Sequence, residues 1–140
     1  MRNYQPLDHV TLDEEVNSIQ LEHRDSDWEP VLAMRREGLY VTISASYGPL
    51  ELALRPRYED LVRTLARLQA VEGLTTTRQV GTSDAYLAIG LSPDGSLMLR
   101  PTIVADATGH LSLNLELSPD AREQLYKWLQ VSESSAAARS

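Results

Sequence analysis

Apolar and polar side chains alternate along short stretches of this chain, and a helical pattern follows them. Across residues 39–47 the odd positions are apolar or aromatic, and the even positions carry Tyr, Thr or Ser. This two-residue period is typical of a half-buried strand, and residues 50–54 continue it after a Gly-Pro turn. After Pro56, apolar side chains recur at helical spacing from Tyr58 to Leu68, which predicts a helix. Gly73 is well placed to end that helix.

The same order of elements occurs twice along the sequence. Residues 16–72 and residues 74–130 each predict four strands followed by one helix. The match extends to the residues themselves, because the apolar stretch Val31–Met34 aligns with Tyr86–Ile89. A repeat of this size predicts two copies of one unit that pack as a pseudo-dimer. We therefore expect an α+β fold: a single domain over residues 16–130, in which two tandem β(4)-α units form antiparallel sheets with two helices about a pseudo-twofold axis.

The second half contains clear boundary signals. Residues 92–95, Ser-Pro-Asp-Gly, are typical of a turn. A long strand is expected from residue 97 to residue 105, and Pro101 is expected to interrupt it or to place it at a sheet edge. Another strand is expected over residues 111–117. Ser118 is expected to cap the second helix, with the following proline at the first helical position.

The two ends of the chain differ from the middle in composition. Residues 1–15 include four acidic side chains and few large apolar ones, so we expect a flexible acidic N-terminus. Residues 131–140 are mostly small and polar, and we expect a disordered tail. The net charge of the chain is −7, and residues 1–30 alone hold eight acidic residues against two arginines. Residues 31–100 are near neutral, which weakens a whole-chain argument against binding a polyanion without reversing it.

Several classes of site are disfavoured by residues that the sequence lacks. The chain has no cysteine, so it has no disulfide, no thiolate nucleophile and no cysteine metal site. Its apolar runs are too short to span a membrane, and its first residues lack the apolar stretch of a secretory signal. We therefore expect a cytoplasmic protein that does not bind membranes.

The sequence contains no motif that predicts catalysis. The spacing of His9, His23 and His110 matches no metal-ligand pattern, and surface polarity is the simpler interpretation of all three. The adjacent acids Glu59 and Asp60 fall in the first turn of the expected helix, where they favour its dipole. We therefore expect no enzymatic activity, no cofactor and no metal ion.

The outer faces of the expected sheets carry the most informative polar residues. Alternation places Tyr40 and Arg55 opposite the buried leucines of the first unit, and Tyr86 and Arg100 opposite those of the second. Arg35 adds charge near the first pair. Aromatic rings beside guanidinium groups are surfaces on which single-stranded bases stack. Exposed tyrosine and arginine are also ordinary cross-strand partners, so the pattern leaves both interpretations open.

The order of four strands and a helix, given twice over residues 16–130, resembles the Whirly and positive-cofactor-four superfamily. It looks closest to a small cyanobacterial family of unknown function that carries this fold in doubled form. The resemblance implies single-stranded DNA binding, as in transcription and organelle genome maintenance. The lysine-rich and glycine-rich signature of plant Whirly proteins is absent, because the chain has one lysine, Lys127. No functional residue is carried over on this resemblance.

Two functions follow as hypotheses from these observations. The first is a non-enzymatic binding module for a protein partner, as in an assembly or regulatory factor, which the net acidity and the edge strands favour. The second is a single-stranded nucleic-acid-binding regulator of the Whirly type, which the fold pattern and the Tyr/Arg face favour. Either protein would be a monomer or, through open sheet edges, a homodimer.

Overall fold

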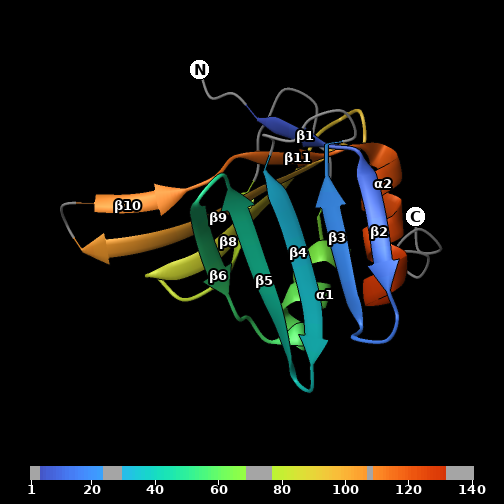
Figure 1. Ribbon diagram of the computed structural model, residues 1–140, viewed down its shortest axis with the longest axis horizontal. Helices are drawn as coiled ribbons and strands as arrows, with labels where there is room; N and C mark the ends of the chain where they lie inside the picture. Colours follow the sequence, from blue (N-terminus) through green and yellow to red (C-terminus); the bar gives the residue numbers. More distant parts are fainter. Residues whose placement is uncertain (1–3, 24–29, 69–76, 107–108, 132–140) are drawn as a thin grey trace.

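The computed structural model describes residues 4–23, 30–68, 77–106 and 109–131. Within these residues the chain forms two helices and eleven strands, and the strands are arranged in two sheets (Figure 1). This arrangement confirms the expected α+β class with two helices and largely antiparallel pairing. The tail that is expected to be disordered lies outside the described residues, apart from Val131.

The first sheet has five antiparallel strands that follow one another in sequence order. These strands are β2 (His9–Asp13), β3 (Ser18–Glu22), β4 (Val31–Glu37), β5 (Tyr40–Tyr47) and β6 (Leu50–Leu54). The expected alternation is confirmed in the middle of β5, where Val41, Ile43 and Ala45 are fully buried, but not at its ends, because Leu39 and Tyr47 are exposed. Gly38 and Gly48 have φ values of 64° and 59°, the left-handed conformation that the two hairpin turns beside β5 require.

The second sheet has six strands, and its order in space differs from its order in sequence. Its strands are β1 (Gln5–Leu7), β7 (Thr77–Gly81), β8 (Ala85–Leu91), β9 (Leu97–Asp106), β10 (Gly109–Ser112) and β11 (Leu115–Leu117). They are ordered β1-β11-β9-β8-β7, and β10 pairs with β9 beside this path. The β1–β11 pair is parallel, whereas the other pairs are antiparallel. β7 therefore forms one edge of this sheet.

Two features of this sheet differ from the sequence-based expectation. Pro101 neither interrupts β9 nor places it at a sheet edge, because β9 lies between β8 and the strands β10 and β11; the strand expected over residues 111–117 is divided into β10 and β11. The Pro101 carbonyl accepts a hydrogen bond from the Leu113 N–H at 3.2 Å, but proline has no N–H to return. The ladder breaks opposite the missing donor, and β9 continues because its other side pairs with Leu87 of β8.

Part of the segment that is expected to be flexible, residues 1–15, forms strands in the described residues. β1 and β2 lie in this segment, and each extends a different sheet. Leu7 explains the order in β1, because its side chain is fully buried in the core between β11 and the first sheet. β2 pairs with β3 over five residues, although its side chains are mostly exposed. Main-chain hydrogen bonds therefore hold an exposed edge strand that side-chain hydrophobicity alone does not predict.

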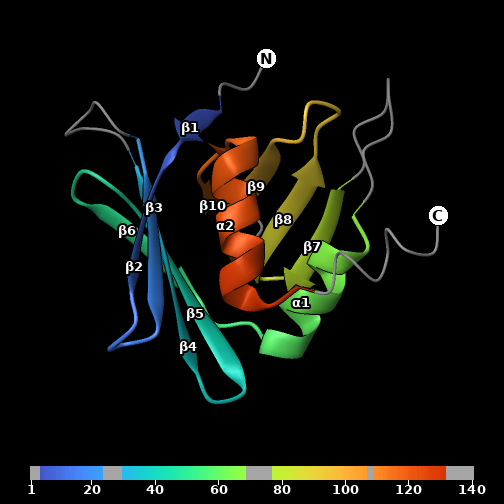
Figure 2. The same cartoon turned by 90° about the vertical axis from the view of Figure 1, so that its right-hand side faces the viewer.

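The two helices fill the space between the inner faces of the sheets. α2 (Pro119–Leu129) lies between the sheets against β2, β3 and β11, and α1 (Tyr58–Ala66) lies beside β7 (Figure 2). Ser118 caps α2 as expected, because its Oγ accepts the Ala121 N–H at 3.1 Å. α1 ends at Ala66, earlier than the sequence indicates, and Gly73 lies outside the described residues.

One hydrophobic core joins both sheets and both helices. Two tyrosines connect the helices to each other. The Tyr58 hydroxyl of α1 donates to the Leu129 carbonyl of α2, and the Tyr126 hydroxyl of α2 donates to the Leu65 carbonyl of α1 at 3.4 Å. The guanidinium carbon of Arg36 lies 4.2 Å from the centre of the Tyr58 ring, which holds that ring against the end of β4.

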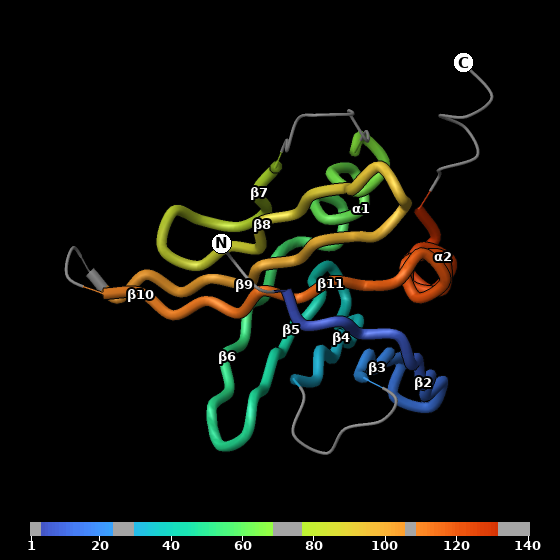
Figure 3. The backbone as a smooth tube through the Cα atoms, turned by 90° about the horizontal axis from the view of Figure 1, so that it is seen from above, coloured from blue at the N-terminus to red at the C-terminus, as the bar shows by residue number. Residues whose placement is uncertain are grey.

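The order β3 to β6 then α1, and β7 to β11 then α2, is the order that the sequence predicts for residues 16–72 and 74–130. The division of one strand into β10 and β11 makes the second series longer by one strand. The β9–β10 hairpin projects beyond the rest of the fold (Figures 1 and 3). A pseudo-twofold relation between the two segments stays a prediction.

Candidate functional site

Three of the residues expected to form a binding face lie together on the first sheet. Tyr40 is exposed on the outer face of β5, and Arg55 is exposed directly after the end of β6; the Arg55 guanidinium carbon lies 4.9 Å from the centre of the Tyr40 ring. Arg35 is exposed on β4, where it pairs in register with Thr42 of β5. The register therefore brings these three side chains to one end of one outer face.

The other two candidate residues lie on the second sheet. Tyr86 pairs with Thr102 and Arg100 pairs with Ala88, so Tyr86 and Arg100 are diagonal neighbours across β8 and β9. Both are half-buried. The inner faces of the two sheets share one core, so their outer faces point in opposite directions (Figure 2). The five residues thus form two separate patches on opposite sides of the molecule.

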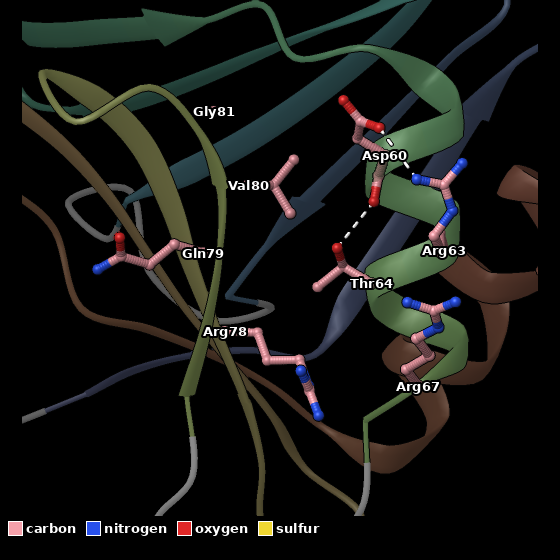
Figure 4. A pocket seen from close by; sticks show the side chains of 8 residues that line it. All are labelled: Asp60, Arg63, Thr64, Arg67, Arg78, Gln79, Val80 and Gly81. Atoms are coloured by element: carbon pink, nitrogen blue, oxygen red, sulfur yellow. Dashed lines mark hydrogen bonds and ion pairs between the residues drawn. The ribbon is translucent and has the colours of Figure 1, made fainter.

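The structure also contains a site that sequence patterns do not indicate, a groove between α1 and β7. It encloses about 300 Å³. Its lining residues come from one face of α1 and from consecutive positions of β7: Asp60, Arg63, Thr64, Arg67, Arg78, Gln79, Val80 and Gly81 (Figure 4). Three of these eight side chains are arginines, so we call this site the arginine groove.

The helix wall of the arginine groove follows from the amphipathic pattern of α1. Leu61 and Leu65 are buried in the core. The neighbouring helix face, with residues at positions i, i+3, i+4 and i+7 counted from Asp60, therefore lines the groove opposite β7. The Thr64 hydroxyl donates to the Asp60 carbonyl at 2.8 Å, so it is engaged within the helix. Arg67 immediately follows the last helical residue and is exposed.

The strand wall is formed by the edge strand β7. Val80 is 5% exposed and supplies an apolar floor, and Gln79 points to the other side of the strand (Figure 4). Arg78 shares the face of Val80 but is exposed, because it lies nearer the start of the strand, where the core does not cover it. Gly81 ends the strand with a φ of 125°, and the Thr82 Oγ1 accepts the Ala85 N–H at 3.1 Å within the following turn.

The arginine groove is positively charged on a chain of net charge −7. Arg63 is 3.4 Å from a carboxylate oxygen of Asp60, and both side chains are about half exposed. Such an exposed pair contributes roughly 0.2–1 kcal/mol. Neither Arg67 nor Arg78 forms an ion pair or a side-chain hydrogen bond with any residue in the described part of the chain. Two guanidinium groups are therefore available to an anionic ligand.

A second cavity of about 270 Å³ lies between the sheets, and its lining has no charged residue. It is lined by Gln5, Pro30, Tyr47, Ser112, Leu113, Asn114 and Leu115. Because charged groups select a ligand more sharply than this mixed lining, the arginine groove is the stronger candidate site.

Comparison with known proteins gives no relative. No protein-family model, no curated protein and no solved structure matches this chain. Among the described residues, no helix combines the length and the apolar character needed to cross a membrane. Across the same ranges, no three His, Cys, Asp or Glu side chains group as metal ligands would.

Sequence reasoning missed the arginine groove because its two walls are distant in the chain. The spacing of Asp60, Arg63 and Arg67 predicts a polar helix face, which is ordinarily a solvated surface. The additional signal is Arg78 on an edge strand, and that position depends on the strand order of the second sheet. To infer the groove from the sequence, one would have to know in advance that α1 packs beside β7.

Proposed function

We propose that this protein is a non-enzymatic binding module that uses the arginine groove to bind an acidic segment of a partner protein. The observation that carries the proposal is the pair Arg67 and Arg78, which flank an apolar floor and have no counter-ion among the described residues. Carboxylates match guanidinium groups in charge and in bidentate geometry.

The chemistry of the groove favours binding over catalysis. Its side chains supply positive charge and hydrogen-bond donors, and its one hydroxyl, on Thr64, donates to a backbone carbonyl. Nucleophilic catalysis needs a nucleophile within hydrogen-bond reach of a base, whereas the Thr64 hydroxyl donates to a backbone carbonyl and the Asp60 carboxylate lies beside Arg63. The lining residues instead combine a charged rim with an apolar centre, which is the composition of a recognition site.

The test measures binding of a short labelled peptide of alternating glutamate and valine by fluorescence anisotropy. Replacing both Arg67→Gln and Arg78→Gln removes two charge-assisted contacts, together worth about 2 kcal/mol, so we expect Kd to rise roughly 30-fold. The affinity of the unmodified protein is also expected to fall as salt is added, because the contacts are partly exposed.

A matched control is available on the outer face of the first sheet, at residues that do not line the groove. Arg35→Gln with Arg55→Gln removes the same two charges from the outer face of the first sheet. This control is expected to change Kd less than threefold or so, because neither side chain lines the groove and contacts between exposed charges are screened by salt. Equal weakening by the two double variants would mean unspecific attraction and would refute the arginine groove as the binding site.

Single-stranded nucleic-acid binding of the Whirly type is the second candidate function. The stacked pair Tyr40 and Arg55, with Arg35 beside it, favours this candidate, as does the resemblance in the order of elements. The same two double variants test it with a labelled oligothymidylate. Nucleic-acid binding by this face predicts that the Arg35/Arg55 variant weakens the oligonucleotide complex, and that Tyr40→Ala weakens it by roughly 1–3 kcal/mol.

A further inference from the structure

The arginine groove runs along a strand edge, and it does not simply cover one face of the sheet. It is lined by four consecutive residues of β7, from Arg78 to Gly81. Successive side chains of a strand point to opposite faces, so a cavity over one face meets alternate side chains. Contact with all four positions places the cavity beside the backbone of β7.

The backbone at this edge has hydrogen-bonding groups to offer. β7 pairs with β8 on one side, from Thr77 opposite Gly90 to Gly81 opposite Tyr86. No strand in the described part of the chain pairs with its other side. In an antiparallel ladder every second residue directs its N–H and C=O away from the partner strand, so β7 presents these groups toward the groove.

The dimensions of the two walls match a short extended segment. The helix wall runs from Asp60 to Arg67, which is about 10 Å of helix axis. The strand wall, from Arg78 to Gly81, spans about 10 Å of extended chain. A segment of about four residues in extended conformation therefore has the length of the groove.

We propose, on the basis of the function proposed above, that the acidic segment binds by strand addition to β7. The segment forms main-chain hydrogen bonds with the edge of β7 that no described strand pairs with, and α1 forms the opposite wall. Its side chains at alternate positions face the groove, where carboxylates meet Arg67 and Arg78. The recognised sequence is thus acidic at positions i and i+2, with little demand on the residue between them.

The charge of the edge also decides which strand can be added. A second copy that paired its own β7 with this β7 would bring Arg78 and Arg67 of both copies into one groove. Like charges at neighbouring cross-strand positions are destabilising. An acidic strand converts the same positions into attractive pairs, and this complementarity favours a separate acidic partner over a second copy.

Backbone methylation of the peptide tests strand addition without changing charge. Two forms of the alternating glutamate–valine peptide are compared, one N-methylated at every glutamate and the other at every valine. Strand addition predicts that one form, whose methyl groups face β7, binds at least tenfold more weakly than the unmethylated peptide. The other form, whose methyl groups face away, is expected to keep its affinity within about threefold.

The outcomes separate this inference from the proposed function. If both methylated forms bind as the parent peptide does, or lose affinity equally, strand addition is wrong. The acidic-partner function still stands in that case, provided that Arg67→Gln with Arg78→Gln weakens the parent peptide. If the parent peptide fails to bind at low salt, both proposals fail.

Two further readouts address other occupants of the edge. Light scattering of the protein without peptide is expected to give the monomer mass, and a dimer that the peptide dissociates would assign β7 to a second copy. Oligothymidylate is expected not to displace the bound peptide. Displacement that is lost in the Arg67→Gln, Arg78→Gln variant would assign the groove to nucleic acid and would overturn the inference.

Discussion

Gly81→Ala is the substitution for which the structure makes the sharpest prediction of lost stability. Gly81 ends β7 with a φ of 125°, a backbone conformation that residues other than glycine rarely adopt. An added Cβ would lie 2.5 Å from the Ala85 carbonyl oxygen and 3.0 Å from the Cα of Tyr86. Both are backbone atoms, and the Ala85 carbonyl is held by the Thr82 N–H at 2.9 Å. The hairpin must therefore shift to admit one methyl group.

The size of the effect follows from two costs that add. A residue forced into a glycine conformation costs about 1–3 kcal/mol. Overpacking by a methyl group against atoms that cannot move away costs a further 1–3 kcal/mol or so. We expect Gly81→Ala to lower the free energy of unfolding by about 3–4 kcal/mol, a large part of the 5–15 kcal/mol that is typical of domains.

The same substitution at two other hairpins provides the control. Gly38 and Gly48 have φ values of 64° and 59°, and an added Cβ at either position meets nothing within 4 Å. Gly38→Ala and Gly48→Ala therefore pay the left-handed backbone cost alone, about 1 kcal/mol each. Asparagine tolerates the left-handed conformation better than alanine does. Gly38→Asn is therefore expected to be more stable than Gly38→Ala, whereas Gly81→Asn is expected to be no more stable than Gly81→Ala.

Urea unfolding followed by circular dichroism measures these differences. The midpoint is expected to fall most for Gly81→Ala, with an unchanged slope m, because the surface exposed on unfolding stays the same. Equal midpoints for Gly81→Ala and Gly38→Ala would refute the reasoning, since the close approach to Ala85 would then carry no cost.

Two other predictions concern hydrogen bonds that fix the fold. Tyr58→Phe removes the donor to the Leu129 carbonyl and is expected to lower the free energy of unfolding by about 1–2 kcal/mol. Its control, Tyr47→Phe at an exposed tyrosine, is expected to change this free energy by less than about 0.5 kcal/mol. Equal urea midpoints for the two variants would contradict the prediction. Hydrogen bonds from the Ser92 hydroxyl, at 2.7 Å, and from the Ser96 N–H, at 2.9 Å, lower the pKa of Asp94 below its usual value. Because the folded pKa lies below the unfolded pKa, the Asp94 carboxylate stabilises the fold above its unfolded pKa, and this contribution disappears as the pH falls through the folded pKa. The stability difference between the unmodified protein and Asp94→Asn is therefore expected to shrink from pH 7 to about pH 2 in urea titrations, and a constant difference would show that the two hydrogen bonds do not favour the charged form.

The elements that the sequence predicts well are those whose signal is local. The alternation in the middle of β5 and the Ser118 cap are confirmed, because a two-residue period and a capping side chain act within a few residues. The turn over residues 92–95 is confirmed for the same reason: the Gly95 N–H donates to the Ser92 carbonyl at 3.0 Å. The α+β class follows from the sum of these local signals.

The features that the sequence does not predict depend on contacts between distant segments. β1 is three residues long, and it is ordered because Leu7 enters the core beside β11, near the other end of the chain. β2 is recognised as a strand through its ladder with β3 rather than through its exposed side chains. The arginine groove has the same origin, because the position of β7 at an edge follows from the non-sequential strand order. Periodicity assigns a residue to a face, but it does not say which element lies opposite that face.

The edges of the two sheets differ in what lies beside them. β10 pairs only with β9 among the described strands, so charge and not exposure alone distinguishes the edge at β7. β6 contacts β8 and β9 of the second sheet, β1 contacts β3 of the first, and β2 contacts α2. These edges thus have neighbours within the fold, and a charged or covered edge resists pairing with other chains. β7 also has a neighbour, α1, but the contact leaves a cavity of about 300 Å³ beside the strand. If strand addition occurs as proposed, the positive charge of Arg67 and Arg78 would oppose a second copy of β7 and favour an acidic strand, so the same two residues would limit self-association and select the partner.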